Sequence, residues 1–325
     1  MNTKITAEQV IAESQFMQDI LTGLQADPKF LQAKYFYDQQ GDLLFQQIMK
    51  LDEYYVTNAE MDILSRQSGA IANLITQGNM AFDLIELGAG DATKSIYLLE
   101  ELTARELEFS YLPIDISAGI ISHLEETLPS KLPGLDVKGL NGDYFEMLEK
   151  GTALSDRRKV VLFMGANIGN MDVAEARDFC KRLRGSLNKG DILIIGFDLK
   201  KDPKQILAAY NDAQGITAAF NLNLLSRINR ELSADFKLEN FEHYPYYDPE
   251  SGACKSYLIS LKDQVVRIGE EAAIRFSAFE PIYMEISQKY SLHEIEEMAR
   301  LTGFQSKHLF FDENKYFVDA VWVVD

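Results

Sequence analysis

The sequence predicts an α/β fold, a doubly wound parallel sheet with a second α+β domain inserted into it. From about residue 82 to 199, short apolar runs alternate with helical patterns, which is the order in which a parallel sheet is built. After residue 200 the pattern changes to helices and antiparallel strands, before one helix and a strand pair close the chain. We therefore expect one domain from residues 60–199 plus 288–325, and another from residues 1–59 plus 200–287.

Helices dominate the segment before the sheet. Residues 6–34 place apolar side chains at helical spacing, with a break at Asp27-Pro28. Asn58 is placed to cap a helix that continues to Leu74. The strands of the parallel sheet are expected at residues 84–87, 107–115, 135–140, 160–164 and 192–198.

Between and after these strands the sequence predicts further helices. Ser117 is placed to cap a helix at 118–128, and a second helix is expected at 173–187. The later elements are expected as helix at 203–238, antiparallel strands within 241–260 and 264–290, helix at 292–302, and strands at 310–311 and 316–324.

Charge and hydropathy narrow the choice of partners. The net charge is −18 and no basic stripe is present, so a nucleic-acid partner would be repelled. No apolar run reaches the ~18 residues of a membrane span, and the acidic amino terminus has no apolar core of a secretory signal. We expect a cytoplasmic protein with no membrane partner, and a monomer.

The segment Asp83–Ser95, D-L-I-E-L-G-A-G-D-A-T-K-S, is expected to form a strand, a glycine turn and the start of a helix. Gly88 and Gly90 allow positive φ and close approach of a ligand to the backbone at the carboxyl edge of the sheet. The spacing of a phosphate-binding P-loop is absent, and Thr93 stands where a dinucleotide fold has its third glycine. A turn that only joins strand to helix is the plain alternative.

A carboxylate just before Gly-x-Gly, as Glu86 is placed here, fits the E-L-G-x-G signature of S-adenosylmethionine-dependent methyltransferases. Asp115 ends the second strand, where a carboxylate can accept both ribose hydroxyls of a nucleoside. Gly142 and Asp143 follow the third strand, within reach of an adenine amino group. Helix capping or solvation is the alternative for Asp115, and a simple turn for Asp143.

Several longer motifs resemble one family. They are F-Y-D at 36–38, E-Y-Y at 53–55, the turn after Glu86, G-x-x-I-G-N at 165–170, A-Y-N-D-A-x-G-x-T-A-A-F-N at 209–221 and N-R-E-L-S-A-D-F at 229–236. The chain thereby resembles the histidine-specific Nα-methyltransferases of ergothioneine biosynthesis from about residue 30 to its end. The resemblance implies a Rossmann-like class I methyltransferase sheet and methylation of L-histidine up to the trimethyl betaine hercynine.

The resemblance also implies a role for individual residues. S-adenosylmethionine, which leaves as S-adenosylhomocysteine, would be bound by Gly88, Lys94, Asp115, Gly142 and Asp143. The amino acid's backbone end would be surrounded by Tyr37, Tyr54, Gly165, Asn170 and Tyr210, and its imidazole would face Glu285 and Ser287. We expect Tyr37, Tyr54 or a water on Asn170 to receive the amine proton. We expect no metal to take part.

The substrate residues also have chemical reasons and plain alternatives. Glu285 and Ser287 stand two apart on a strand, so they share a face and can meet both nitrogens of one imidazole. Without the resemblance, an exposed strand pair, a turn role for Asn170 and core packing of the tyrosines are the simpler interpretations. Electron-rich rings nevertheless suit an ammonium that gains methyl groups.

Ser256 departs from the family pattern, because family members have Met beside the imidazole at this position. The smaller side chain leaves room in the ring pocket, which is altered or filled from elsewhere. The alternatives are therefore a methyltransferase of the same fold acting on another amino acid of the tryptophan type, or on a ring nitrogen of histidine. A non-catalytic cofactor-binding protein and a hydride-transfer enzyme are more distant alternatives.

Overall fold

The computed structural model describes residues 7–76, 81–105, 107–270 and 272–325, which divide into two compact units. Unit 1 comprises Met1–Tyr54 and Asp202–Ser287, and unit 2 comprises Tyr55–Lys201 and Gln288–Asp325. The chain therefore passes from one unit to the other after Tyr54, Lys201 and Ser287. The assignment of cofactor binding to one domain and substrate binding to the other stays a prediction.

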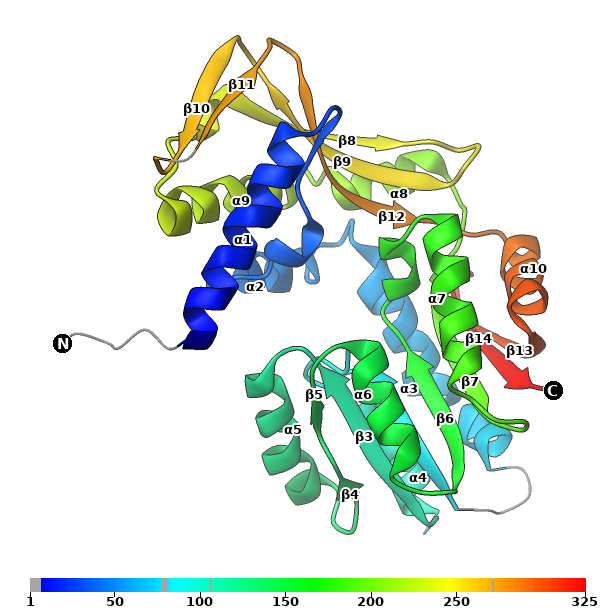
Figure 1. Cartoon of the computed structure of the whole chain (residues 1–325). Helices are drawn as coiled ribbons and strands as arrows, with labels where there is room; N and C mark the ends of the chain where they lie inside the picture. The colour runs from blue at the N-terminus through cyan, green and yellow to red at the C-terminus, as the bar shows by residue number, and fades with distance from the viewer. Residues whose placement is uncertain (1–6, 77–80, 106, 271) are drawn as a thin grey trace. The chain divides into compact units, whose positions relative to one another are not determined.

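Unit 2 is built on an eight-stranded sheet with the order β13-β14-β7-β6-β2-β3-β4, and β5 also pairs with β3 (Figure 1). Its strands are β2 Phe82–Leu87, β3 Phe109–Asp115, β4 Asp136–Val137, β5 Leu140–Asn141, β6 Arg158–Phe163, β7 Ile192–Asp198, β13 Phe304–Phe311 and β14 Phe317–Val324. β2 to β7 pair in parallel, whereas β14 is antiparallel to both β7 and β13. The doubly wound sheet and its closing strand pair are confirmed.

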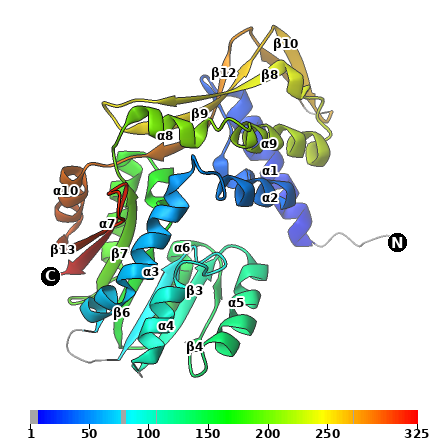
Figure 2. The same cartoon turned by 180° about the vertical axis from the view of Figure 1, so that it is seen from behind.

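Helices cover both faces of this sheet. Figure 1 shows α6 and α7 on one face, and Figure 2 shows α3 and α4 on the opposite face. The helical segments are α3 Tyr55–Ile75, α4 Ile96–Ala104, α5 Ala118–Lys131, α6 Tyr144–Ala153, η2 Asn167–Asn170, α7 Val173–Gly185 and α10 Leu292–Thr302. Because both faces are covered, every residue of β2 and β7 is buried. That is why these strands are continuous apolar runs in the sequence.

One apolar core joins the sheet to α6, α7 and α10. It contains Leu148 of α6, Leu183 of α7 and Ile295 of α10, each fully buried against strand residues such as Phe197. Burial of each such side chain contributes about 1.5–3 kcal/mol. Parallel strands that share one core end together at the same edge, so the residues that follow β2, β3 and β6 become neighbours.

Unit 1 contains a four-stranded sheet with the order β1-β12-β9-β8 and a separate two-stranded sheet of β10 and β11. Its elements are α1 Ala7–Gln25, β1 Lys29–Phe30, η1 Ala33–Tyr35, α2 Gln39–Ile48, α8 Pro203–Tyr210, α9 Ile216–Leu232, η3 Leu238–Asn240, β8 Phe241–Tyr247, β9 Ala253–Ser260, β10 Gln264–Ile268, β11 Ala272–Phe276 and β12 Pro281–Gln288.

Burial alternates along β9 and β12, as expected for strands with one face in a core. Leu258 and Met284 point into that core together with Ile20 of α1 and Leu224 of α9. The opposite face of β12 carries half-buried residues, among them Glu285 and Ser287. The second domain, which is predicted to be α+β, thus has an apolar core of its own.

Several predicted boundaries were wrong. α3 begins at Tyr55 rather than at Asn58, because Tyr55 and Val56 are already packed inside unit 2. The third strand is interrupted, since Gly139 donates its N–H to the Glu125 carboxylate instead of to β3. The helical segment 203–238 is divided by the turn that ends at Gly215.

The closing elements were predicted more accurately. α10 occupies the expected residues 292–302, and Gly303 ends it with a φ of 86°. The following strand begins directly at Phe304, earlier than expected, because its pairing with β14 runs back to that residue. No helix within the described ranges is long and apolar enough to span a membrane.

Candidate functional site

The glycine turn after β2 has the conformation that the sequence predicts. Gly88 has a φ of 71° and Gly90 a φ of 53°. The N–H of Gly88 donates to the carbonyl of Ile114, 2.8 Å away, which fixes the turn beside the end of β3. A Cβ on Gly88 would lie only 2.7 Å from the hydroxyl oxygen of Tyr144, whereas Gly90 faces open space. Glycine is therefore required at 88 by both backbone conformation and space.

Asp115, the last residue of β3, contacts this turn directly. One carboxylate oxygen accepts the N–H of Gly90 at 3.2 Å, and the other accepts the N–H of Ser117 at 2.9 Å. A carboxylate has about four acceptor positions, so two further donors can be accommodated. The structure thus places a carboxylate at the edge where a nucleoside is bound in folds of this class.

The segment after β5 adds a second acid to the same edge. Gly142 donates its N–H to the carbonyl of Asp115 at 3.1 Å, and Asp143 caps α6 through the N–H groups of Phe145 and Glu146. The exposed Asp143 therefore lies after the third predicted strand, as expected, and it also caps a helix, which is the simpler role for this residue. Next to it, burial and the charges of Asp115 and Asp143 raise the pKa of Tyr144 to about 12.

Lys94, which follows the glycine turn, forms an ion pair with Glu60 of α3. The second oxygen of Glu60 accepts the N–H of Gly165, the residue two positions after β6, at 2.7 Å. Burial alone would lower the pKa of Lys94, but the charge of Glu60 outweighs it and the pKa is raised. Lys94 is therefore a fixed, charged group at the carboxyl edge.

Glu86 lies beneath the turn rather than beside open space. It is 4% exposed, and its carboxylate accepts a hydrogen bond from the buried hydroxyl of Tyr111. Burial raises its pKa to about 7, against the opposing hydrogen bonds of Tyr111 and Ser95. This position favours support of the turn, and the predicted contact with a cofactor stays a prediction.

Asn170 ends η2 and is exposed, in the loop that also contains Gly165. Gly169 before it is buried, and a Cβ there would lie 2.9 Å from the carbonyl oxygen of Gln288. The close packing of Gly169 fixes the end of the loop, so the exposed amide of Asn170 is carried on a well-defined backbone.

The three predicted tyrosines of unit 1 lie in one aromatic cluster. Tyr37 packs edge-on against Phe45, with ring centroids 5.6 Å apart, and Phe45 packs against Tyr54 at 6.4 Å. Tyr54 in turn packs against Tyr210 at 6.3 Å. Tyr37 remains 49% exposed, whereas Tyr54 and Tyr210 are half-buried. The cluster brings together side chains from three separate sequence motifs.

Tyr210 also connects this cluster to β12. Its hydroxyl donates to the Ser287 hydroxyl oxygen at 2.6 Å. Glu285 stands two residues earlier on the same strand, and both side chains are half-buried. Glu285 and Ser287 therefore lie two residues apart on one strand, as predicted, and Ser287 contacts the predicted Tyr210.

Ser256 has a hydrogen-bond partner that the sequence did not suggest. It is 2% exposed, and its hydroxyl lies 3.0 Å from Nε2 of His243 on the paired strand β8. Burial lowers the pKa of His243 to about 4, against the opposing charge of Asp212. The small side chain of Ser256 is thus accompanied by a neutral imidazole from the next strand.

Sequence reasoning missed Glu60, Tyr144 and His243. Glu60 does carry a signal, because it interrupts the apolar face that Val56, Ile63 and Leu64 form at helical spacing on α3. Tyr144 and His243 carry none, since their contacts are with residues on other elements. The predicted residues fall into two groups, one at the carboxyl edge of unit 2 and one around the tyrosines of unit 1.

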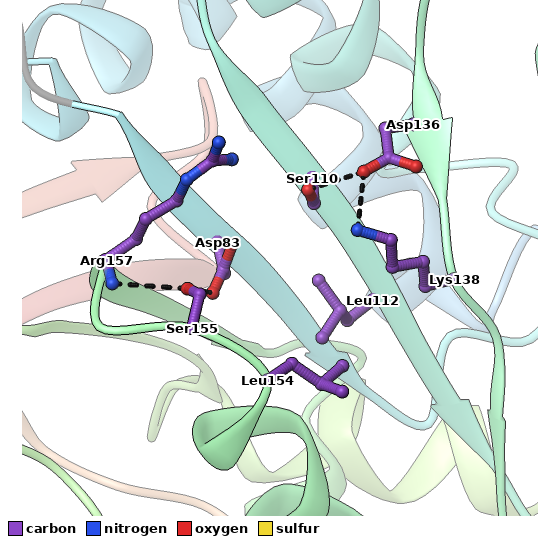
Figure 3. Close-up of a pocket in the computed structure, with 8 residues that line it drawn as sticks. All are labelled: Asp83, Ser110, Leu112, Asp136, Lys138, Leu154, Ser155 and Arg157. Carbon is purple, nitrogen blue, oxygen red and sulfur yellow. Dashed lines mark hydrogen bonds and ion pairs between the residues drawn. The ribbon is translucent and has the colours of Figure 1, made fainter.

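A separate cavity of about 250 Å³ lies in unit 2 at the amino ends of the strands (Figure 3). It is lined by Asp83, Ser110, Leu112, Asp136, Lys138, Leu154, Ser155 and Arg157. Asp83, Ser110 and Arg157 stand at the starts of β2, β3 and β6, the opposite edge from the glycine turn. The cavity is therefore distinct from the edge where ligands bind in this fold.

Within the described ranges, no group of three or more His, Cys, Asp or Glu side chains is arranged to hold a metal ion.

Comparison with known proteins gives consistent matches over most of the chain. Residues 16–324 match the family model described as "Histidine-specific methyltransferase, SAM-dependent". A histidine N-alpha-methyltransferase of Mycolicibacterium smegmatis is 36% identical over 296 residues, covering 91% of this chain and 90% of the relative. That of Mycobacterium tuberculosis is 35% identical over 297 residues, covering 91% of each. An L-tryptophan methyltransferase of Psilocybe serbica is 30% identical, covering 90% of this chain and 88% of the relative.

Proposed function

The chain belongs to the family of histidine-specific, S-adenosylmethionine-dependent methyltransferases, and we propose that it methylates the α-amino group of L-histidine. Successive transfers would give the trimethyl betaine hercynine, an intermediate of ergothioneine biosynthesis. The observation that carries the proposal is the family match over residues 16–324, supported by two relatives of that activity at 35% and 36% identity. The geometry of both residue groups supports the roles that we propose below.

For the cofactor, we propose that Asp115 accepts the ribose hydroxyls and that Gly88 and Gly90 allow close approach to the backbone. Asp115 is already oriented by two backbone N–H groups, so the cofactor meets a preorganised acceptor. Gly142 and Asp143 would contact the adenine, and Lys94 the amino-acid end. Glu86 would act from below, by holding the turn through Tyr111.

For the substrate, we propose that Asn170, Gly165, Tyr37, Tyr54 and Tyr210 surround the amino and carboxylate groups. Amide and phenol groups are neutral donors, so they do not change protonation as methyl groups accumulate on the nitrogen. The aromatic faces also favour a quaternary ammonium and a sulfonium. The packing of the three tyrosines in one cluster supports their acting together.

For the imidazole, we propose that Glu285 accepts one ring N–H and that Ser287 meets the other nitrogen. A serine hydroxyl can accept and donate at once, so its contact with Tyr210 is compatible with this role. A substrate ring without both nitrogens would leave the Glu285 carboxylate poorly satisfied, which is a basis for rejecting it. Ser256 would lie beside this pocket with His243 as its partner.

The reaction is an in-line displacement in which the neutral amine attacks the sulfonium methyl. The new C–N bond forms as the S–CH₃ bond breaks, and S-adenosylhomocysteine leaves as a neutral thioether. Most of the rate enhancement would come from positioning and desolvation. Before each transfer one proton leaves the amine. Tyr37 or Tyr54 would receive it while its own hydroxyl proton passes to solvent, or a water on Asn170 would receive it and pass it to solvent. No metal is required by this chemistry.

We further propose that the protein acts as a monomer in the cytoplasm, without a membrane or nucleic-acid partner. The net charge of −18 supports the last of these points, since a phosphate backbone would be repelled. Light scattering coupled to size-exclusion chromatography tests the oligomeric state directly.

A second candidate is methylation of another amino acid, because an L-tryptophan methyltransferase is also similar to this chain and Ser256 departs from the family pattern. The test is mass spectrometry of products after incubation with S-adenosylmethionine and an equimolar mixture of amino acids. Gains of one to three methyl groups on histidine, with fragments that place them on the α-nitrogen, are expected. Methylation of tryptophan alone, or at a ring nitrogen of histidine, would exclude the proposal in favour of that alternative.

A further inference from the structure

Glu60 is a fully buried carboxylate that is bonded to two parts of the carboxyl edge of unit 2. It is 0% exposed and lies on α3, far in sequence from both partners. Its Oε1 accepts the N–H of Gly165 at 2.7 Å, and its Oε2 pairs with the ammonium of Lys94. One side chain thus joins the loop after β6 to the residue that follows the glycine turn.

The surroundings of Glu60 are shaped around its carboxylate. A Cβ on Gly196 of β7 would lie 2.5 Å from Oε1, so glycine at this strand position makes the space for the acid. A Cβ on Gly165 would lie 3.4 Å from Lys94 Nζ, so the loop and the lysine are neighbours as well. A bulky aliphatic side chain at position 60 would have filled an ordinary core equally well, but it could not bond either partner.

Asp319 lies next to this arrangement. It is 0% exposed on β14 and stands directly opposite Gly196 in the sheet. Burial and the charge of Glu60 raise the pKa of Asp319 well above its usual range, although Lys94 opposes this shift. Glu60 is the carboxylate that contacts the ammonium of Lys94.

We propose that Glu60 is a positioning residue for methyl transfer. It holds Lys94 where the cofactor would bind and the backbone of Gly165 where the substrate would bind. The substrate part rests on the proposed function. The cofactor part rests on the proposed contact of Lys94 with the amino-acid end of the cofactor, but not on which amino acid is methylated. Glu60 would touch neither ligand and would act through its two partners.

The test compares Glu60→Gln and Glu60→Asp with the unmodified protein. Gln keeps an oxygen for the N–H of Gly165 but loses the charge that holds Lys94, whereas Asp keeps the charge and is one methylene too short to reach both. We expect the dissociation constant of S-adenosylhomocysteine, measured by calorimetry, to rise about tenfold in Glu60→Gln, as a lost charge-assisted contact predicts. In Glu60→Asp, both the dissociation constant of S-adenosylhomocysteine and the KM for the amino acid should rise.

Asp83→Asn is the matched control. Asp83 is 3% exposed and pairs with Lys159, which is also 3% exposed, at 2.7 Å. Figure 3 shows Asp83 beside the cavity at the amino ends of the strands. This variant also breaks a carboxylate–lysine pair of unit 2, so it should lower the thermal midpoint in a similar way. Its cofactor affinity and KM should nevertheless stay within about twofold of the unmodified protein.

The inference is overturned if Glu60→Gln binds S-adenosylhomocysteine as tightly as the unmodified protein, or if Asp83→Asn weakens binding equally. If Glu60→Gln does not fold, the same comparison with Glu60→Asp decides. A failure of the proposed function looks different, because the unmodified protein would then bind the cofactor and leave histidine unmethylated.

Discussion

At the scale of single residues, a few carboxylates account for most of the site's expected behaviour, and their surroundings give each a different role. Asp115 is half-buried and oriented by backbone N–H groups, Glu86 is buried and accepts a hydrogen bond from a tyrosine hydroxyl, and Glu60 is paired with a lysine. The same functional group is therefore a half-buried acceptor, a support for a turn, or a fixed counter-charge. Burial and the neighbouring hydrogen-bond donors decide which of these roles each carboxylate takes.

Changing Asp115 to Ala should weaken cofactor binding most strongly among the edge residues. The variant loses the acceptor for the ribose and also the contact that holds the N–H of Gly90. Two lost hydrogen bonds to a charged acceptor correspond to roughly a 100-fold rise in the dissociation constant of S-adenosylhomocysteine, measured by calorimetry. Asp136→Ala, at the opposite edge of the sheet, serves as the control and should bind normally. Unchanged affinity in Asp115→Ala would contradict the assignment.

Changing Glu285 to Ala should weaken the amino acid and leave the cofactor unaffected. Loss of the carboxylate leaves one ring N–H without an acceptor, which predicts a ~10- to 100-fold rise in the KM for histidine. The affinity for S-adenosylhomocysteine should not change. Glu242→Ala, an exposed residue on β8 of the same sheet, is the control. An unaltered KM for histidine in Glu285→Ala would remove Glu285 from the pocket.

At the scale of elements, the helix ends follow local sequence rules, whereas the strand ends depend on distant partners. α7 and α10 each begin with a capping box, Asp172 with Glu175 and Ser291 with Glu294. The end of β7 is different. Asp198 there is 1% exposed and accepts from Tyr55 at 2.9 Å and from Lys289 at 2.6 Å, and it also pairs with Lys201.

Asp198→Ala should therefore destabilise unit 2 by about 3–5 kcal/mol, because it leaves two buried ammonium groups without their common counter-charge. Chemical denaturation followed by circular dichroism measures the change. Asp178→Ala, whose ion pair with Lys181 on α7 is exposed, should cost less than about 1 kcal/mol. Equal losses in the two variants would show that the Asp198 cluster contributes no more than a surface pair.

At the scale of the whole molecule, the chain is strongly acidic and also buries ionisable side chains. The net charge is −18, and some of the buried charges are paired, such as Asp83 with Lys159 and Asp198 with Lys289. The buried groups with shifted pKa values therefore control how stability changes with pH. His243 in unit 1 is a clear case, because its pKa falls from 6.5 to about 4 on burial.

The sign of this effect follows from proton binding. Between pH 6.5 and 4 the unfolded chain binds a proton at His243 and the folded protein does not, so stability falls as the pH falls through this window. The loss should reach up to ~3 kcal/mol at pH 4 relative to pH 7. His243→Gln should lack this part of the pH dependence, as measured by denaturant unfolding at each pH. A difference between the two proteins that stays constant with pH would contradict the prediction.

The sequence by itself determined the features that depend on neighbouring residues. The run Leu84–Leu87 followed by Gly88 and Gly90 specifies a buried strand and a turn, Ser117 specifies a helix start, and Gly303 specifies a helix end. The residues that follow parallel strands could also be placed at one edge, because strand polarity is set by the alternating order of elements.

Only the tertiary structure decided the contacts between distant segments. Glu60 and Gly165 are 105 residues apart, Tyr55 and Asp198 are 143 apart, and Tyr210 and Ser287 are 77 apart. A buried polar side chain must find a partner, but its own sequence neighbours do not specify which one. The identity of that partner depends on which elements the shared core packs together. This is why Asp115 was predictable from the sequence and the Glu60 and His243 contacts were not.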